Sequence, residues 1–349
     1  MVGRRAAPTA AGWGATVNTG EAGVEILRLG HVEYRVTDLE RARAFYVDLL
    51  GFVETGRDGT RVYLRGLEER DHHSLVLRQA PAPGVSHFAF RVAAPDDLQR
   101  LHRRCTARGL PTRWIEAGEE AGQGKALRVQ DAAGLPVEFY HEIDQIERQL
   151  QRFDLYRGPH IMRIDHVNVQ VPDVQAAYEW YTREWGFGCS EYTETDDRPA
   201  QLWAAWLHRK HNVHDIALMN GRGPRLHHAG FWVTDALAVL RACDIMAGAG
   251  HQNAIERGPG RHGLSNALFV YLRDGDRNRI ELYTGDYLVA DPDWRPIRWS
   301  INDPRRATFW GHVPPQSWFD EASPVESILD GSLIEPTEPR LRDRPSFVT

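Results

Sequence analysis

The chain repeats a segment of its own sequence, and this repeat constrains the fold more than any other feature. The segment HVEYRVTDLERARAFYVDLLGF, which starts at His31, aligns without a gap with HVNVQVPDVQAAYEWYTREWGF, which starts at His166. Each copy reads as an alternating strand, a capping Asp and an amphipathic helix that ends at a glycine. Internal similarity of this kind indicates repeated structural units. The sequence therefore predicts copies of one strand-helix unit.

Two shorter segments with the same pattern complete the repeat. They are HFAFRVAAPDDLQRL, from His87, and HAGFWVTDALAVLRA, from His228. After each helix come short strand-like runs that Gly, Asp and Pro turns separate. We therefore predict an α+β fold of four βαβββ modules, paired into two domains.

The repeat also sets the expected boundaries. We expect a flexible Gly- and Ala-rich leader at 1–24, an N-terminal domain at 25–145 and a linker at 146–160. A C-terminal catalytic domain at 161–290 follows. The tail at 291–349 is rich in Pro and Trp, and we expect it to act as a lid over the pocket.

Composition excludes several classes of protein. The net charge is -6 and no long Lys or Arg run occurs, which disfavours a nucleic-acid partner. No apolar stretch reaches the roughly 18 residues of a membrane span, and the start lacks the apolar middle of a secretory signal. The three cysteines are far apart, which argues against a disulfide framework. We expect a cytoplasmic protein with a small-molecule partner.

Strand alternation places histidines on one face of the expected sheets. In each module-opening strand the alternate apolar residues must pack on a helix, so the leading histidine faces the opposite, concave side. The same rule places Glu281 on the concave face and turns His227 away from it. Gly230, two residues after His228, then leaves room for a substrate.

Two histidines and one carboxylate on an open sheet face form a facial triad. This ligand set holds a divalent transition metal and leaves coordination positions free. His166, His228 and Glu281 fit it, and their equivalent places in repeated modules strengthen the prediction.

Longer motifs occur in the same order as in a known family. The segments RIDHVNVQVPD, AAWLHRKHNVHDIALMNGRGPRLHHAGFWV, IERGPGRHGLSNALFVYLRD and RIELYTGDYLVADPDW resemble the type I extradiol catechol dioxygenases of the vicinal-oxygen-chelate superfamily. The likeness runs from about residue 28 to residue 330 and is greatest to members that cleave 3,4-dihydroxyphenylacetate. It implies two glyoxalase/bleomycin-resistance-like domains and insertion of both atoms of O2 into a catechol, which gives a muconic semialdehyde. It also implies Fe2+ or Mn2+ as cofactor and a homotetramer.

The resemblance implies three catalytic side chains besides the metal ligands. His214, in NVHDIAL, matches the acid/base that hydrogen-bonds oxygen, and Tyr271 matches a tyrosine that hydrogen-bonds the substrate oxygen. His262, in GRHG, matches a histidine of the substrate pocket.

The resemblance also implies substrate contacts. Asn168 and Trp206 are expected to line the pocket, and Arg257 matches an arginine that contacts the substrate carboxylate. The family's paired arginines before a Trp-Gly correspond to Arg305 and Arg306, which stand one place early here. A catechol with another side chain therefore remains open.

The N-terminal half departs from the family. Such enzymes have usually lost the metal site there, whereas His31, His87 and Glu138 occupy the equivalent positions in this chain. Counterparts of Tyr271 and of GRHG are absent, so we expect a vestigial, catalytically silent site. A glyoxalase-type isomerase and a metal-free binding protein remain alternative functions of the scaffold.

Overall fold

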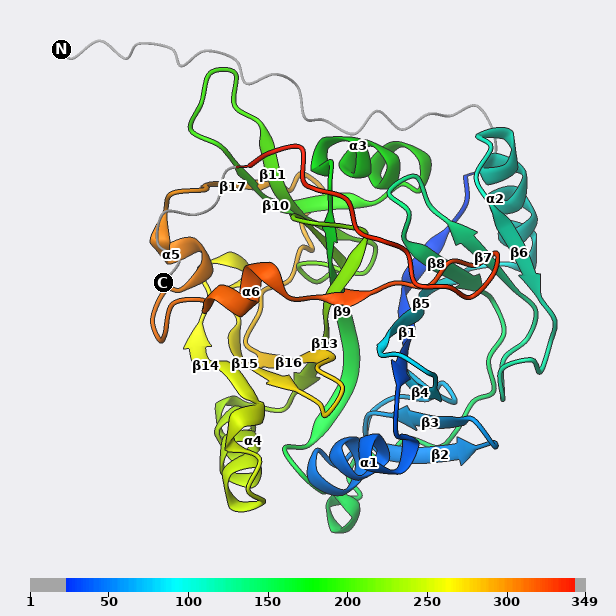
Figure 1. Ribbon diagram of the computed structural model, residues 1–349, viewed down its shortest axis with the longest axis vertical. Coiled ribbons are helices and arrows are strands. Elements are labelled where there is room, and N and C mark those ends of the chain that lie inside the picture. The colour runs from blue at the N-terminus through cyan, green and yellow to red at the C-terminus, as the bar shows by residue number, and fades with distance from the viewer. Residues whose placement is uncertain (1–22, 343–349) are drawn as a thin grey trace.

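The structure is a computed structural model that describes residues 23–342 (Figure 1). Its elements follow one another as four βαβββ modules, which confirms the predicted fold. The leader expected at 1–24 lies outside the described residues up to residue 22, and the expected tail does so from residue 343. No helix within 23–342 is long and apolar enough to cross a membrane.

The first two modules form an eight-stranded sheet. The first comprises β1 (Ile26–Val36), α1 (Leu39–Arg43) with a π-helical extension (Ala44–Leu49), β2 (Val53–Arg57), β3 (Arg61–Arg65) and β4 (Leu75–Gln79). The second comprises β5 (Gly84–Val92), α2 (Pro95–Ala107), β6 (Thr112–Ile115), β7 (Ala126–Gln130) and β8 (Pro136–Tyr140). The strand order is β2-β3-β4-β1-β5-β8-β7-β6, so the two module-opening strands are neighbours.

The last two modules form a second sheet of the same design. The third comprises β9 (Ile161–Val171), α3 (Val174–Glu179) with a π-helical extension (Trp180–Glu184), β10 (Gly188–Glu194), β11 (Leu202–His208) and β12 (Ile216–Asn220). The fourth comprises β13 (Arg225–Val233), α4 (Ala236–Gly248), β14 (Ile255–Arg261), β15 (Leu268–Arg273) and β16 (Arg279–Thr284). Short 3-10 turns occur at Phe153–Leu155, Gln252–Ala254 and Leu264–Asn266.

The chain after β16 returns to both sheets. It contains β17 (Ile297–Ser300), α5 (Pro304–Ala307), α6 (Gln316–Asp320) and β18 (Ser323–Pro324). β17 pairs with β10 and β18 pairs with β13, whereas Val325 bridges to Val85 of the first sheet. The segment therefore ties the two halves together across their junction.

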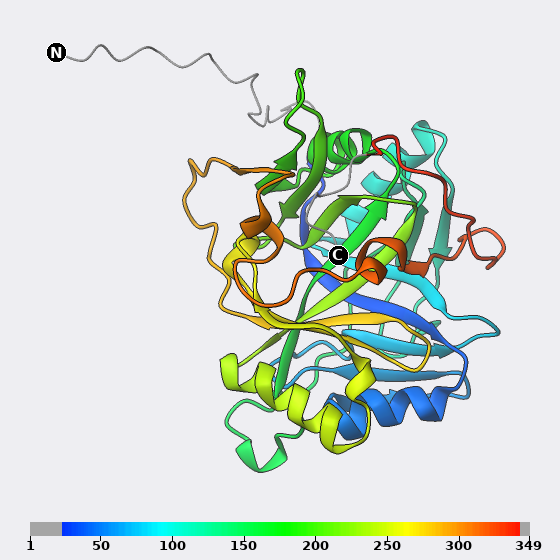
Figure 2. The same ribbon diagram turned by 60° about the vertical axis from the view of Figure 1, so that its left-hand side comes forward.

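A tyrosine shared by the two long repeats explains how the halves pack. Tyr46 donates to Asp274 in the fourth module at 3.0 Å, and Tyr181 donates to Asp131 in the second module at 2.9 Å. Figures 1 and 2 accordingly show α1 beside α4 at one end of the molecule and α2 beside α3 at the other. Burial raises the pKa of each aspartate to about 6. The repeat thus encodes a two-fold arrangement as well as a module.

Candidate active site

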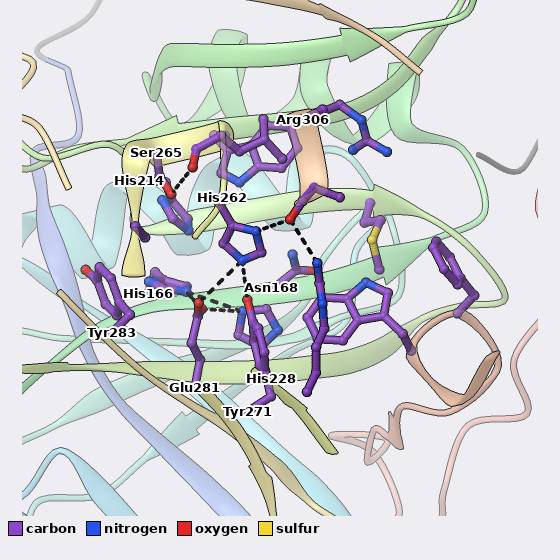
Figure 3. Close-up of a pocket in the computed structure, with 18 of the residues that line it drawn as sticks. His166, Asn168, His214, His228, His262, Ser265, Tyr271, Glu281, Tyr283 and Arg306 are labelled. Atoms are coloured by element: carbon purple, nitrogen blue, oxygen red, sulfur yellow. Dashed lines mark hydrogen bonds and ion pairs between the residues drawn. The ribbon is translucent and has the colours of Figure 1, made fainter. Parts of the chain in front are cut away.

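The three predicted metal ligands converge from neighbouring strands of the second sheet (Figure 3). His166 lies on β9, His228 on β13 and Glu281 on β16, and β13 runs between the other two strands. Nε2 of His166 is 3.3 Å from Nε2 of His228 and 3.0 Å from Oε2 of Glu281. The same carboxylate oxygen is 3.2 Å from Nε2 of His228. Three buried donor atoms therefore face one point.

The spacing of these donors fits a divalent metal ion. Such an ion binds histidine nitrogen and carboxylate oxygen at about 2.1 Å, so donors at right angles around it lie roughly 3.0 Å apart. The observed separations of 3.0 to 3.3 Å match this geometry. Two imidazole nitrogens and one carboxylate also form the donor set of a facial triad. The residues present can therefore hold a metal and leave positions open.

Gly230 makes room for the side chain of His166, a predicted metal ligand, rather than for a substrate. It pairs with His166 on one side and with Glu281 on the other. A Cβ at this position would overlap the imidazole ring of His166. Only glycine lets that ring cross β13 to reach Glu281, which corrects the expectation that Gly230 leaves space for a substrate.

Asp165 orients the first ligand. The pairing register of β9 with β13 skips this residue as a β-bulge, and its Oδ2 lies 3.2 Å from Nδ1 of His166. The carboxylate accepts the proton of Nδ1, so Nε2 is the nitrogen that faces the metal position, and a metal that binds there displaces the Nε2 proton. Burial opposes the charged imidazole, but hydrogen bonds to Asp165 and Glu281 outweigh it and raise the pKa of His166 to about 9. An acidic residue directly before the histidine was the sequence signal for this role.

A second bulge corrects the expected orientation of His227. The register of β13 with β9 skips His227, because its two neighbours pair with consecutive residues. The side chain is fully buried, and its Nδ1 lies 2.7 Å from Nδ1 of His228. Simple alternation failed here because a bulge adds one residue to the strand.

The contacts of His227 fix the tautomer of the second ligand. Its Nε2 lies 2.8 Å from the carbonyl oxygen of Trp318, which can only accept, so Nε2 carries the proton. Its Nδ1 must then accept the Nδ1 proton of His228. Nε2 of His228 is left with a free lone pair toward the triad.

His214 lies beside the triad in the same cavity. Its ring centroid is 4.0 Å from that of His166, and its buried Nδ1 has no hydrogen-bond partner among the described residues. Burial, together with the charge of His166, holds the pKa of His214 well below its ordinary value. The side chain is therefore a neutral imidazole, which can accept or deliver a proton.

Tyr271 and His262 form a hydrogen-bonded pair on the other side of Glu281. Nδ1 of His262 donates to the carbonyl oxygen of Ala307 at 2.5 Å, so its Nε2 accepts the hydroxyl proton of Tyr271 at 2.9 Å. Burial and then Glu281 raise the pKa of Tyr271 well above its usual range. The phenol therefore remains protonated.

Aromatic side chains wall the cavity. Asn168 and Trp206 line it, where they were expected. Trp318, on α6, packs edge-on against Tyr271 with ring centroids 4.3 Å apart, and Phe319 lies beside it in the lining. The sequence pointed to five tail aromatics as a lid, Trp299, Phe309, Trp310, Trp318 and Phe319. Of these, Trp318 and Phe319 line the cavity, whereas Phe309 and Trp310 are exposed.

Two buried arginines complete the lining. Nη2 of Arg257 donates to Ala307 and Thr308, whereas its Nε and Nη1 have no hydrogen-bond partner among residues 23–342. Nε of Arg306 is likewise unpaired within that range. Burial lowers the pKa of each guanidinium to about 10. Both nevertheless remain cationic at neutral pH.

Arg305 is not part of this cavity. Its side chain is 70% exposed and pairs with Asp303 at 2.8 Å. The structure brings only the second residue of the arginine pair to the site, because the short helix α5 turns successive side chains in different directions.

The two halves match one family model. Residues 28–139 and 163–282 each match the Glyoxalase/Bleomycin resistance protein/Dioxygenase superfamily. A manganese-dependent 2,3-dihydroxybiphenyl 1,2-dioxygenase from Geobacillus genomosp. 3 is 34% identical over 82% of this chain and 94% of its own. A metapyrocatechase from Pseudomonas sp. (strain CF600) is 34% identical with the same coverage.

Solved structures agree with these sequence relatives. The anaerobic complex of homoprotocatechuate 2,3-dioxygenase from Brevibacterium fuscum with 3,4-dihydroxyphenylacetate is 41% identical, with a TM-score of 0.87 over 90% of this chain and 98% of that chain. An extradiol ring-cleaving dioxygenase from B. fuscum is also 41% identical, with a TM-score of 0.88 over 91% of this chain and 88% of that one. The chain therefore belongs to the Glyoxalase/Bleomycin resistance protein/Dioxygenase superfamily and, within it, to the extradiol ring-cleaving catechol dioxygenases.

Proposed function

We propose that this chain cleaves a catechol that carries an anionic side chain, with 3,4-dihydroxyphenylacetate as substrate. Both atoms of O2 enter the product, a muconic semialdehyde. The observation that carries this proposal is a pair of buried arginines with unpaired N–H groups in the cavity that holds the triad. The substrate complex of the B. fuscum enzyme supports the choice of 3,4-dihydroxyphenylacetate.

We assign the metal to His166, His228 and Glu281. Fe2+ is the expected ion and Mn2+ the alternative, since this donor set accepts both. The manganese-dependent relative supports the second choice. When bound, the ion supplies the redox path by which triplet oxygen reacts with a singlet catechol.

The polar side chains around the triad position the substrate and move protons. Because the hydroxyl proton of Tyr271 points to Nε2 of His262, the phenol oxygen is free to accept a hydrogen bond from a catechol hydroxyl. The neutral imidazole of His214 lies beside His166, where it can take up a proton that the catechol releases and pass it to oxygen. Asn168 and Trp206 bound the space between them.

The arginines select the side chain of the substrate. Arg257 lies 4.4 Å from the ring centroid of Trp318, which holds it in place, and Arg306 lies 5.0 Å from that of Trp203. A carboxylate placed between their free N–H groups forms charge-assisted hydrogen bonds to two buried guanidinium groups. Arg305 has no part in this site.

One experiment tests both the reaction and the selectivity. The purified chain is reconstituted anaerobically with Fe2+ or Mn2+, mixed with 3,4-dihydroxyphenylacetate and exposed to air. We expect equimolar oxygen uptake and a yellow product, and a lower kcat/KM for 4-methylcatechol, which lacks the carboxylate. No uptake with either catechol would exclude ring cleavage, whereas equal kcat/KM values would exclude only the role of the arginines.

The remaining organisation is also proposed. We infer domains at 25–145 and 161–290, joined by a linker at 146–160, with the tail from 291 as a lid. Support for the lid comes from Arg306, Trp318 and Phe319, which reach the cavity from that tail. The family resemblance supports a homotetramer, and the composition supports a cytoplasmic location. Light scattering of the purified chain checks the tetramer.

A further inference from the structure

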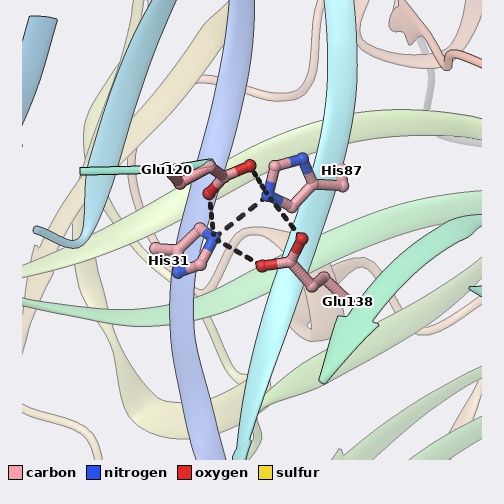
Figure 4. A group of neighbouring side chains, drawn as sticks. All are labelled: His31, His87, Glu120 and Glu138. Carbon is pink, nitrogen blue, oxygen red and sulfur yellow. Dashed lines mark hydrogen bonds and ion pairs between the residues drawn. The ribbon is translucent and has the colours of Figure 1, made fainter. Parts of the chain in front are cut away.

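A second cluster of metal-ligating side chains lies in the N-terminal domain (Figure 4). His31 on β1, His87 on β5 and Glu138 on β8 occupy the strand positions of the triad ligands in the other domain. A fourth side chain, Glu120, enters from the loop between β6 and β7. All four are at most 1% exposed. The loop residue has no place in the repeat, so the sequence comparison did not reveal it.

The donor atoms of this cluster surround one point. Nε2 of His31 is 3.0 Å from Nε2 of His87, 3.8 Å from Oε2 of Glu120 and 3.6 Å from Oε1 of Glu138. Nε2 of His87 lies nearer the other oxygen of each carboxylate, 3.7 Å from Oε1 of Glu120 and 3.8 Å from Oε2 of Glu138. Four donors that bind one ion tetrahedrally at about 2.1 Å lie roughly 3.4 Å apart. One donor atom from each of the four residues lies within 4.8 Å of the others, so modest side-chain shifts would bring the set to that arrangement.

The charges in the cluster leave a place for a cation. The Arg128 guanidinium donates hydrogen bonds to both carboxylates, at 2.6 Å to Oε2 of Glu138 and with a second bond to Oε1 of Glu120, and Gln123 donates to Oε1 of Glu138 at 2.7 Å. Oε2 of Glu120 is buried and has no hydrogen-bond partner in the described part of the chain. This oxygen is the one that faces His31. A buried carboxylate oxygen without a partner is costly, and a metal ion would satisfy it.

We propose that the N-terminal domain binds a second divalent metal ion through His31, His87, Glu120 and Glu138, with Zn2+ as the best match. Zn2+ binds histidine nitrogen and carboxylate oxygen, and a closed, four-coordinate arrangement is typical of structural rather than catalytic zinc sites. The ion would join β1, β5, β8 and the loop before β7 at the centre of the first sheet.

The surroundings of this ion exclude ring cleavage there. Arg128 pairs with Glu138 across β7 and β8 as Tyr271 pairs with Glu281 across β15 and β16. Its guanidinium therefore occupies the side from which a substrate would approach. Four protein donors also leave no open coordination position, in contrast to the three donors of the catalytic triad.

The number of bound ions per chain tests the proposal. The full-length protein, produced with Zn2+, Fe2+ and Mn2+ in the medium, is measured by elemental analysis. We expect two ions per chain in the wild type, and one each in Glu281→Gln and Glu120→Gln. The matched control is Glu119→Gln, an exposed neighbour that pairs with Arg113, and it should keep both ions.

Thermal unfolding gives a second, independent reading. In the metal-stripped Glu281→Gln variant only the N-terminal site remains, so added Zn2+ should raise Tm by binding the folded state. The shift should be absent when Glu120→Gln is added, or when His87→Gln is used in its place. One ion per chain in the wild type, with no Zn2+-dependent shift, would overturn the proposal and would mean that Arg128 replaces the metal. That result would not affect the proposed ring cleavage, because that reaction depends on the site of Glu281 and not on the N-terminal cluster.

Discussion

The two metal-ligand clusters occupy equivalent strands but differ in the residue that precedes the first histidine. In the C-terminal domain this residue is Asp165, which accepts the Nδ1 proton of His166. In the N-terminal domain it is Gly30, where any Cβ would overlap the hydroxyl of Tyr140. Nδ1 of His31 consequently has no hydrogen-bond partner among the described residues. One domain thus orients its first ligand and the other does not.

The clusters differ again on the side from which a substrate approaches. The C-terminal triad faces a cavity bounded by Tyr271 and His262, whereas the guanidinium of Arg128 and the carboxylate of Glu120 close the N-terminal cluster. Both domains keep a buried, neutral histidine beside the first ligand, His214 in one and His73 in the other. Strand register therefore supplies the ligands, and their neighbours decide whether a site can do chemistry.

The same substitution in the two domains should separate these roles most strongly. Glu281→Gln removes the charged ligand of the open site, so we expect it to abolish ring cleavage and release the catalytic ion. Glu138→Gln changes only the closed cluster and should leave the rate of ring cleavage close to that of the wild type. Oxygen uptake and metal content measure both. Equal losses of activity would show that the two clusters do not differ in function.

The next contrast concerns His214, which lies beside His166, and His73, which lies beside His31. His214→Asn should lower kcat by roughly a hundredfold to ten-thousandfold, the usual contribution of an acid/base, while metal content stays unchanged. His73→Asn should leave kcat unchanged because no substrate reaches the closed cluster. Steady-state kinetics with 3,4-dihydroxyphenylacetate checks this pair. The assignment fails if both variants lose kcat or if His214→Asn loses its metal.

The cavity arginines should affect selectivity more modestly. Arg257→Met removes charge-assisted hydrogen bonds, so kcat/KM for 3,4-dihydroxyphenylacetate should fall roughly tenfold to a hundredfold. The value for 4-methylcatechol should not change, and neither value should change in the exposed control Arg305→Met. An equal fall for both catechols would mean that Arg257 supports the fold rather than the substrate.

His227, which precedes the predicted metal ligand His228, should affect the affinity of the site for its metal. His227→Leu removes the acceptor that fixes the tautomer of His228, and we expect metal affinity to fall about tenfold. His227→Gln can still accept and donate, so it should restore most of that affinity. Competition with a chelator measures both. Wild-type affinity in the leucine variant would rule out the proposed role of His227.

The two tyrosine–aspartate hydrogen bonds that join the halves should contribute equally to stability, whereas the two metal-ligand clusters differ in function. Tyr46→Phe and Tyr181→Phe each remove one buried hydrogen bond to an aspartate, at 3.0 and 2.9 Å. Each should lower the free energy of unfolding by roughly 1–2 kcal/mol. Denaturant titration checks this. A large difference between the two variants would contradict the two-fold packing.

Residues that recur with the repeat could be predicted from the sequence. The alternation of apolar residues gave the four modules and placed His166, His228 and Glu281 on one face. Equivalent positions in the N-terminal half followed in the same way. Such inferences succeed because the alternation of a strand and the spacing of the repeat can both be recognised in the sequence without knowledge of tertiary packing.

Residues that depend on irregular backbone could not be predicted in this way. A bulge turned His227 toward the ligands, although alternation assigned it to the other face. A loop brought Glu120 to the second cluster, and α5 brought Arg306 rather than Arg305 to the cavity. Bulges, loops and short helices take their direction from tertiary packing, which single-sequence patterns do not contain.

Anomalous diffraction at the iron absorption edge tests the central claim most directly. Crystals of the iron-loaded protein, soaked with 3,4-dihydroxyphenylacetate under anaerobic conditions, should show an iron peak between His166, His228 and Glu281. The catechol oxygens should lie beside that peak, with the carboxylate against Arg257 and Arg306. The absence of a metal peak at this position, or a catechol bound elsewhere in the chain, would contradict the account.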